Sequence, residues 1–473
     1  MKKWKARAYQ FLAFCKIVAN AKFALFLDPG LGKTSTTLAG INVLLKLKKT
    51  KGVLLIAPVR VIYGVWPEEI KKWSNFSHIS HCNLNADISN IWSKSDIYLI
   101  NPESLFKLHK ELLQGLNSGK SLNFDMLVID ESTKFSAYNT NRFQYMTDML
   151  CLFRRRLILT GTPAASSLMG LWSQIYLLDE GKALGVNFHR FRQTYFEKSE
   201  YCKHTWFCKE DTKDEIYRKI APMVLDMKAE EHIDMPELVI NDIFVRLKPK
   251  AMKIYKEMER ELFTEVDECG VLAKTSTQKR LICHQMANGR FYEPIPENLD
   301  DDEVKIFKKN RKVIKLHEEK LDATEDLIAE LHGKPILIGY HYKHDYQALT
   351  ERLGDVAHIG AGVTGKQLTD TLEAWNAGEI PILVAHPRSM AHGLNMQQSC
   401  VNLLFYSLAD STEDYLQFVA RIYRQGNDGD TVTVHRLISK GTVDEAIIRT
   451  NTSGQEQQTT LRVALRKYHA RLS

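Results

Sequence analysis

Residues 23–35 read Phe-Ala-Leu-Phe-Leu-Asp-Pro-Gly-Leu-Gly-Lys-Thr-Ser, a short apolar run followed by a glycine turn. A helical pattern continues over 33–49, so the local order is strand, loop and helix. A phosphate-binding loop needs this order, because glycines let backbone N–H groups face phosphate oxygens and a helix N-terminus favours their charge. The pattern G-x-x-x-x-G-K-[ST] has glycine where this chain has Leu27, so a tight turn without a ligand stays open as the alternative.

The loop contains the residue types that bind a nucleoside triphosphate and its metal ion. Gly30 and Gly32 would let the backbone turn toward the phosphates, and Lys33 would reach the β- and γ-phosphates. The hydroxyl of Thr34 would bind Mg²⁺. A GTPase would read guanine with an N-K-x-D segment, which this sequence lacks. The expected cofactors are therefore ATP and Mg²⁺.

Two further strand-like runs end in polar residues that would complete such a site. The run 125–130 ends at Asp130, which would organise Mg²⁺, and the adjacent Glu131 would orient and deprotonate a water molecule. The run 155–163 contains Thr160 and Thr162, which would hydrogen-bond the acidic pair and sense the γ-phosphate. The simpler interpretations are an acidic helix cap for the first run and a Gly-Pro turn for the second.

Short apolar runs alternate with helical patterns at both ends of the chain, which predicts α/β domains with parallel sheets. The runs are 23–27, 52–58, 96–102, 125–130 and 155–163, and later 334–340, 379–386, 400–407 and 430–438. Between them, the stretches 250–266 and 305–333 show apolar residues at helical spacing, and 237–247 is the main strand-like stretch. We expect an ATP-binding domain over 1–186, a helical middle region over 187–332 and a second α/β domain over 333–473.

The composition allows a nucleic-acid partner and gives no sign of a membrane span. The formal net charge is +7 and the isoelectric point is about 8.8, a mild basic excess that suits nucleic acid without requiring it. No run of ~18 apolar residues is present, so we expect no association with a membrane. The first residues lack the apolar segment of a signal peptide, which predicts the cytoplasm, or the host cytoplasm if a phage encodes the protein.

The phosphate loop, the acidic pair and the Thr-Gly-Thr turn together resemble the motors of helicase superfamily two. That group has a variable residue at the position of Leu27. The segment KARAYQFLAF at 5–14 is similar to the L-R-P-Y-Q segment of SWI/SNF-type DNA-dependent ATPases, and the resemblance implies that Gln10 reads adenine. The segments 54–73, 97–108, 167–181, 336–345 and 386–407 are similar to further motifs of that family. The resemblance covers about residues 5–450 and implies two RecA-like domains in tandem.

The segment QFVARIYRQGN at 417–427 resembles the family pattern Q-x-x-x-R-x-x-R-x-G. Spacings of four and three would place Gln417, Arg421 and Arg424 on one face of a helix. The resemblance implies that both arginines enter the ATP site of the first domain as arginine fingers, that Gln417 couples ATP to motion, and that Gly393 of the preceding motif helps to bind the nucleotide. A solvated basic helix face is the alternative.

The resemblance also implies contacts to a nucleic-acid backbone, and we expect double-stranded DNA as the partner of a monomeric chain. The expected contacts are Arg60, Asn101, His341, Tyr342 and Lys343. The leading hypothesis is an ATP-dependent translocase on double-stranded DNA. A strand-separating DNA or RNA helicase is the second hypothesis. A clamp that binds nucleic acid and uses ATP only to change shape, without productive hydrolysis, is the third.

Overall fold

The computed structural model describes residues 2–164, 167–198, 206–268, 273–293, 295, 300–360, 362–363, 365–390, 394 and 396–470. The chain forms two compact units, which we describe separately. The first unit contains Met1–Asp234 and Gly454–Ser473, and the second contains Met235–Ser453. The first unit therefore includes both ends of the chain.

The first unit contains a seven-stranded parallel sheet in the order β3-β4-β2-β5-β6-β1-β9. Its strands are β1 (Lys22–Leu27), β2 (Val53–Ile56), β3 (His81–Asn83), β4 (Ile97–Ile100), β5 (Met126–Asp130), β6 (Arg155–Thr160) and β9 (Val224–Met227). The predicted strands of this half are confirmed. Their central members are buried along their length because both faces of the sheet are covered, which explains their continuous apolar runs. A two-stranded antiparallel pair, β7 (Phe196–Lys198) and β8 (Trp206–Cys208), lies outside this sheet.

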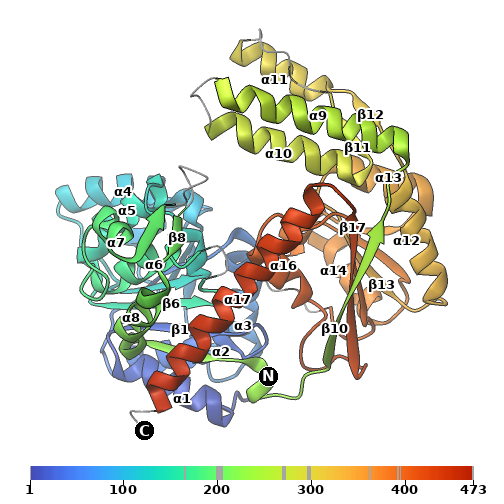
Figure 1. Ribbon diagram of the computed structural model, residues 1–473. Helices are drawn as coiled ribbons and strands as arrows, with labels where there is room; N and C mark the ends of the chain where they lie inside the picture. Colours follow the sequence, from blue (N-terminus) through green and yellow to red (C-terminus); the bar gives the residue numbers. More distant parts are fainter. Residues whose placement is uncertain are drawn as a thin grey trace. The chain divides into compact units, whose positions relative to one another are not determined.

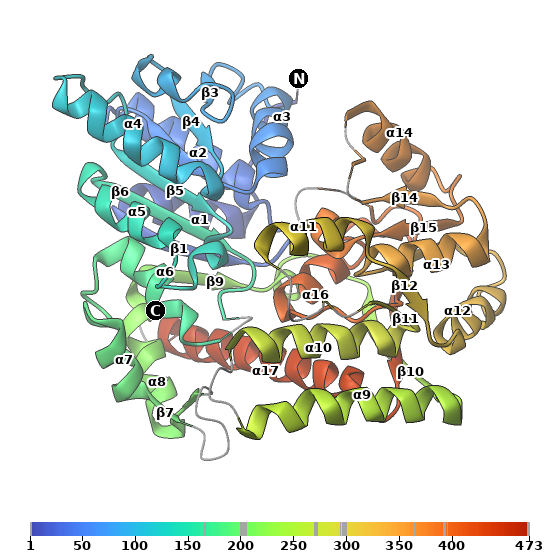
Figure 2. The same cartoon turned by 90° about the horizontal axis from the view of Figure 1, so that it is seen from above.

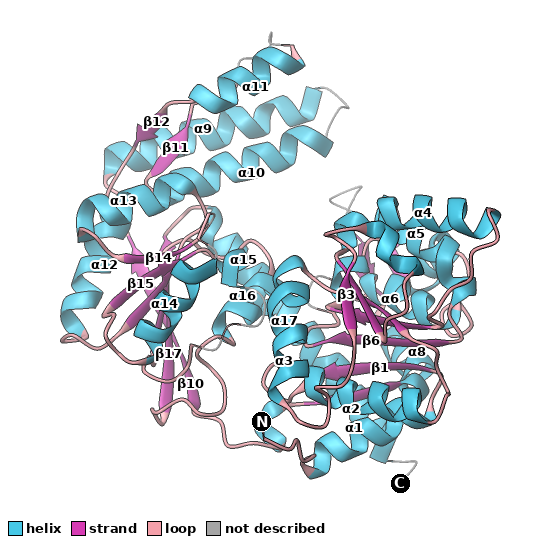
Figure 3. Ribbon diagram, turned by 180° about the vertical axis from the view of Figure 1, so that it is seen from behind, coloured by secondary structure: helices cyan, strands magenta, loops and turns pink. Residues whose placement is uncertain are grey.

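Helices cover both faces of this sheet. They are α1 (Ala8–Ala19), α2 (Lys33–Lys46), α3 (Trp66–Lys72), α4 (Leu105–Asn117), α5 (Asn141–Met149), α6 (Gly170–Asp179), α7 (Phe188–Tyr195) and α8 (Glu210–Ile220). Helices α1 and α2 lie on one face, and α5 and α6 lie on the other (Figure 3). Because parallel strands end at the same edge, the segments that follow β1, β5 and β6 gather at one edge of the sheet.

The second unit contains a six-stranded parallel sheet in the order β10-β17-β16-β13-β15-β14. Its strands are β10 (Glu237–Val245), β13 (Ile336–Gly339), β14 (Ala357–Ile359), β15 (Ile382–Ala385), β16 (Asn402–Phe405) and β17 (Thr431–Ser439). Alternate residues of β13 enter different cores. Ile336 and Ile338 pack with Leu321 and Leu349, whereas Leu337 packs with Trp375. The expected α/β class, with two RecA-like parallel-sheet domains, is therefore confirmed.

The helices of the second unit are α9 (Pro249–Glu268), α10 (Ala273–Asn288), α11 (Asp301–Asn310), α12 (Glu319–Glu330), α13 (Lys343–Leu353), α14 (Gly365–Asn376), α15 (Pro387–Met390) and α16 (Thr412–Val419). Helices α9 and α10 run side by side (Figure 2) and share a small core around Tyr255 and Met286. The helical interpretation of 305–333 is partly wrong. Strand β12 (Val313–Lys315) separates α11 from α12, because it pairs with β11 (Arg290–Tyr292).

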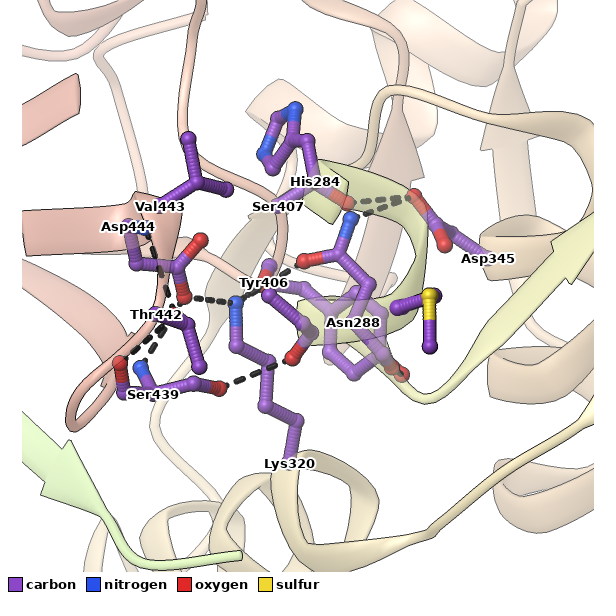
Figure 4. Close-up of polar contacts among 12 residues, drawn as sticks. His284, Asn288, Lys320, Asp345, Tyr406, Ser407, Ser439, Thr442, Val443 and Asp444 are labelled. Atoms are coloured by element: carbon purple, nitrogen blue, oxygen red, sulfur yellow. Dashed lines mark hydrogen bonds and ion pairs between the residues drawn. The ribbon is translucent and has the colours of Figure 1, made fainter. Parts of the chain in front are cut away.

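A buried polar network joins the helical insertion to the sheet of the second unit (Figure 4). The amine of Lys320 lies 2.8 Å from a carboxylate oxygen of Asp444, and both side chains are fully buried. The same amine donates to the side-chain oxygen of Asn288 at 2.8 Å and to the carbonyl of Tyr406 at 3.3 Å. The Tyr406 hydroxyl donates to the Asn288 carbonyl at 2.9 Å. This network fixes α10 and α12 to β16 and to the start of the last helix.

The last helix, α17 (Val443–Ala470), begins in the second unit and ends in the first (Figure 1). Leu461 and Leu465 are fully buried in the core of the first unit. This part of the chain is therefore a packed component of the first unit. Among the described residues, no helix is long and apolar enough to cross a membrane.

Candidate nucleotide-binding site

The loop between β1 and α2 has the backbone geometry that its glycines predict. Gly30 has φ of 90° and Gly32 has φ of 74°, both in the left-handed region that favours glycine. Helix α2 begins at Lys33, directly after Gly32, so the helix N-terminus opens at the loop. A Cβ atom on Gly32 would lie 2.5 Å from the side-chain nitrogen of Gln10. The loop therefore packs against α1, and the left-handed φ of Gly32 favours glycine there, since a larger residue would be strained and would displace the Gln10 side chain.

Gln10, the residue predicted to read adenine, lies at the edge of the loop. Its side-chain nitrogen donates to the carbonyl of Leu31 at 3.2 Å, and its oxygen accepts from the backbone N–H of Arg7 at 3.0 Å. Next to it, the ring of Tyr9 stacks on His232 with centroids 5.1 Å apart. Gln10 therefore links the phosphate loop to the start of α1.

Lys33 is held inside the loop by backbone carbonyls. Its amine donates to the carbonyl of Leu27 at 2.7 Å and lies 3.4 Å from that of Asp28. Burial lowers the pKa of the Lys33 amine, and the negative charges of Glu131 and Asp130 oppose that shift. The lysine and the acidic pair therefore share one electrostatic environment, although 97 residues separate Lys33 from Asp130.

Asp130 ends β5, and its carboxylate is oriented by an indole. The Nε1–H of Trp66, a fully buried residue at the start of α3, donates to Oδ2 of Asp130 at 3.0 Å. Burial raises the pKa of Asp130, while the Trp66 hydrogen bond and the charge of Lys33 lower it. The Asp130 carboxylate and the Thr34 hydroxyl are hard oxygen donors, the chemistry that Mg²⁺ prefers. The chemistry of these two side chains therefore suits a Mg²⁺ ion.

Glu131 adopts a backbone conformation that is uncommon for a residue with a side chain. Its φ is 62° and its ψ is 60°, in the left-handed region. Conformations of this type cost about 1–3 kcal/mol and persist where neighbouring contacts enforce them. The next residue makes one such contact: the Ser132 hydroxyl donates to the side-chain oxygen of Gln174 at 2.7 Å. The strained conformation at Glu131 is consistent with a functional constraint on its carboxylate.

The Thr-Gly-Thr turn after β6 touches the phosphate loop. A Cβ atom on Gly161 would lie 3.2 Å from Cδ of Pro29, so the two turns approach closely. The Thr160 hydroxyl accepts from the backbone N–H of Thr162 at 3.0 Å. Gln174 of α6 donates to the carbonyl of Pro163 at 2.9 Å while it accepts from Ser132. Gln174 therefore connects the turn with the acidic segment, a link that no sequence motif indicated.

The two arginines of the second unit do not share a helix, so that prediction is wrong. Helix α16 ends at Val419, before Arg421. The Arg421 guanidinium donates to the carbonyls of Gln417 and Leu394, both at 3.0 Å. Its own N–H bonds to Phe418, so the side chain takes the carbonyl that a continued helix would use. The guanidinium of Arg424 has no hydrogen-bond or ion-pair partner in the described part of the chain.

The expected nucleic-acid contacts differ in their surroundings. Asn101 is buried, donates to Glu103 at 2.9 Å, and its side-chain oxygen has no hydrogen-bond partner among the described residues. His341 lies 3.3 Å from Asp410, and the Tyr342 hydroxyl lies 3.0 Å from Nδ1 of His284. Lys343 is exposed at the start of α13. Arg60 is half-buried before α3. Gly393 lies outside the described residues.

The first unit gathers a glycine-rich loop, an acidic pair and a Thr-Gly-Thr turn at one edge of a parallel sheet, the arrangement typical of phosphate-loop enzymes with RecA-like domains. The family model of the SNF2-related domain matches residues 7–290, which is more than half of the chain. The chain belongs to this family. It is therefore a nucleic-acid-dependent ATPase of the SWI/SNF type within helicase superfamily two.

Two curated proteins and one solved structure illustrate what the chain is similar to. The chain is 30% identical over 482 residues to protein p41 of Acyrthosiphon pisum secondary endosymbiont phage 1, covering 99% of this chain and 100% of that protein. It is 22% identical to the Chromodomain-helicase-DNA-binding protein 1-like of Mus musculus, covering 89% of this chain but 46% of the relative. A solved Sulfolobus solfataricus SWI2/SNF2 ATPase core in complex with dsDNA is similar at a TM-score of 0.44 and 20% identity, covering 99% of this chain and 97% of that chain.

Proposed function

We propose that this protein hydrolyses ATP when it is bound to nucleic acid and uses the energy to move along double-stranded DNA without separating the strands. The observation that carries the proposal is the shared electrostatic environment of Lys33, Asp130 and Glu131 at one edge of the first sheet. Membership of the SNF2-related domain family supports the same conclusion. The names of relatives refer to DNA binding and DNA repair, which supports DNA over RNA.

We assign the residues of the first unit as follows. Lys33 leaves the carbonyls of Leu27 and Asp28 to bind the β- and γ-phosphates, and the N–H groups around Gly30 and Gly32 cradle them. When bound, Mg²⁺ supplies charge neutralisation between phosphate oxygens, held by Thr34 and Asp130. Glu131 accepts a proton from the attacking water. Gln10 selects adenine at the edge of the loop, and Thr160 and Thr162 sense the γ-phosphate.

The second unit would supply positive charge that stabilises the negative charge of the phosphoryl group in the transition state. Arg424, whose guanidinium has no hydrogen-bond or ion-pair partner among the described residues, and Arg421, held by two carbonyls, are proposed as arginine fingers. Such groups are worth ~10³–10⁵ in rate. Gln417 and Gly393 are assigned to coupling and nucleotide binding on the resemblance of their segments. Lys343 and Arg60 are the proposed phosphate contacts to nucleic acid, together with Asn101, His341 and Tyr342.

The Glu131→Gln variant separates hydrolysis from an ATP-switched clamp. It keeps the size of the side chain but removes the base, so nucleic-acid-stimulated phosphate release should fall to background while ATP binding persists. Stimulated phosphate release that survives this change would refute the assignment of the base. A strand-separating helicase is distinguished by its substrate. It would release a labelled strand from a forked duplex, whereas a duplex translocase would not.

A further inference from the structure

The last helix places a buried arginine beside the phosphate loop. The guanidinium of Arg462 lies 2.6 Å from a carboxylate oxygen of Asp28 and donates to the carbonyl of Gly161 at 2.6 Å. Gln458, one turn earlier, donates to the same carbonyl at 3.0 Å. Nε of Arg462 is 3.4 Å from Asp226, at the end of β9. One side chain therefore contacts the phosphate loop, the Thr-Gly-Thr turn and the neighbouring strand.

Burial makes these contacts strong and specific. The side chain of Arg462 is 3% exposed and that of Asp226 is 0% exposed. The two terminal nitrogens of the guanidinium are satisfied in a planar fork by Asp28 and the Gly161 carbonyl, whereas Nε has no hydrogen-bond partner among the described residues. Asp28 is also held from the other side, because its Oδ2 accepts from the backbone N–H of Ala229 at 3.0 Å. Asp28 is thereby fixed between β9 and α17.

The charge of Arg462 reaches the nucleotide site. Arg462 pairs with the carboxylate of Asp28, and the backbone carbonyl of the same residue lies 3.4 Å from the Lys33 amine. The carboxylates near Lys33 are those of Asp28, Asp130 and Glu131. Without Arg462, Lys33 would face them alone, and the site would repel the phosphates of ATP more strongly. Asp28 follows directly on β1, so its position also sets the carbonyls to which Lys33 is bonded.

We propose that Arg462 is a positioning residue for ATP binding, through which the C-terminal helix holds the phosphate loop and the Thr-Gly-Thr turn in their working arrangement. The residue touches the loop and not the reacting atoms, so its effect falls on nucleotide affinity. The proposal rests on the ATP site of the first unit and is independent of the kind of nucleic acid that the protein follows. The helix that carries Arg462 is covalently continuous with the second unit, because α17 begins there, whereas its link to the phosphate loop is the ion pair with Asp28.

The test compares Arg462→Gln, Asp28→Asn and the double variant, using binding of fluorescent mant-ATP in the absence of nucleic acid. Arg462→Gln should weaken binding by ~10–100-fold, the range for a lost supporting contact behind a ligand-binding group. The double variant should recover most of that loss, because the unpaired carboxylate of Asp28 is gone. In steady-state assays the change should appear in KM for ATP, with kcat at saturating ATP little altered. Arg449→Gln, an exposed position earlier on α17, is the matched control and should behave as the wild type.

Thermal unfolding shows whether each variant is folded. If Arg462→Gln does not fold, Arg462→Lys decides, since lysine keeps one ion pair with Asp28 but lacks the fork that also reaches Gly161. Folded Arg462→Gln or Arg462→Lys with wild-type mant-ATP affinity would overturn the proposal. Equal losses with and without the Asp28 substitution would overturn it as well. If the protein proves to prefer another nucleic acid over double-stranded DNA, the mant-ATP affinities of the variants relative to the wild type should stay the same, because they are measured without nucleic acid.

Discussion

The indole of Trp66 offers a way to perturb the metal-binding carboxylate without touching it. Trp66→Phe removes the hydrogen bond of 3.0 Å to Asp130 and keeps an aromatic ring in a fully buried position. A hydrogen bond to a charged group contributes about 1.5–3 kcal/mol. If that contribution is realised in the transition state, nucleic-acid-stimulated kcat/KM should fall ~10–150-fold.

The same substitution should change how the enzyme responds to Mg²⁺ and to acid. The Trp66 bond lowers the pKa of Asp130 against the raising effect of burial, so its loss raises that pKa further. The variant should therefore need more Mg²⁺ for half-maximal ATPase activity, and its activity should begin to fall at a higher pH on the acid side.

Trp92→Phe is the matched control for this experiment. It removes another indole hydrogen bond to a carboxylate in the same unit, 2.7 Å from Nε1 to Glu111, away from the acidic pair. Trp92→Phe should leave the Mg²⁺ requirement and the acid limb unchanged. If both variants shift the two properties equally, the Trp66 bond acts only through general stability, and our reasoning about Asp130 is refuted.

Three further outcomes follow from the structure. Gly32→Ala should weaken mant-ATP binding, because a Cβ at φ of 74° strains the loop and displaces Gln10, whereas Gly119→Ala, with a similar φ of 83° but outside the phosphate loop and with no atom within 4 Å, should bind normally. Lys320→Met should lower the free energy of unfolding in urea by about 3–5 kcal/mol, since it leaves Asp444 buried and unpaired; a loss below 1 kcal/mol would contradict this. Thermal stability should fall as pH drops below about 6.5. Burial lowers the pKa of several histidines in the folded protein, so the unfolded chain binds protons at a higher pH than the folded chain does. Identical melting temperatures at pH 8 and pH 5.5 would contradict this prediction. Those histidines are His81, His317, His358, His386 and His435.

The strands and the phosphate loop were predictable because their determinants are local. The run 23–27 is apolar throughout, since β1 lies in the middle of a sheet covered on both faces, and the glycines after it are needed for positive φ. The end of α16 was not predictable, because it depends on the Arg421 side chain turning back to the carbonyl of Gln417. Helical spacing alone suggested a longer helix.

The contacts that support the site were invisible in the sequence because their partners are far apart. Arg462 meets Asp28 across more than four hundred residues, and neither Arg462 nor Gln458 belongs to a recognisable motif. Trp66 lies within a family-like segment, yet nothing in its spacing points to Asp130. Motif reasoning found the residues proposed to touch ATP, and the fold was needed to find those that hold them.

The most direct test of the central claim measures ATPase activity with single-stranded DNA, double-stranded DNA and RNA side by side, followed by displacement of a third strand from a DNA triplex. A duplex translocase should be stimulated most by double-stranded DNA and should displace the third strand in an ATP-dependent way while the underlying duplex stays paired. Glu131→Gln should abolish both signals. Equal ATPase activity with and without nucleic acid, or strand separation in place of triplex displacement, would contradict the account.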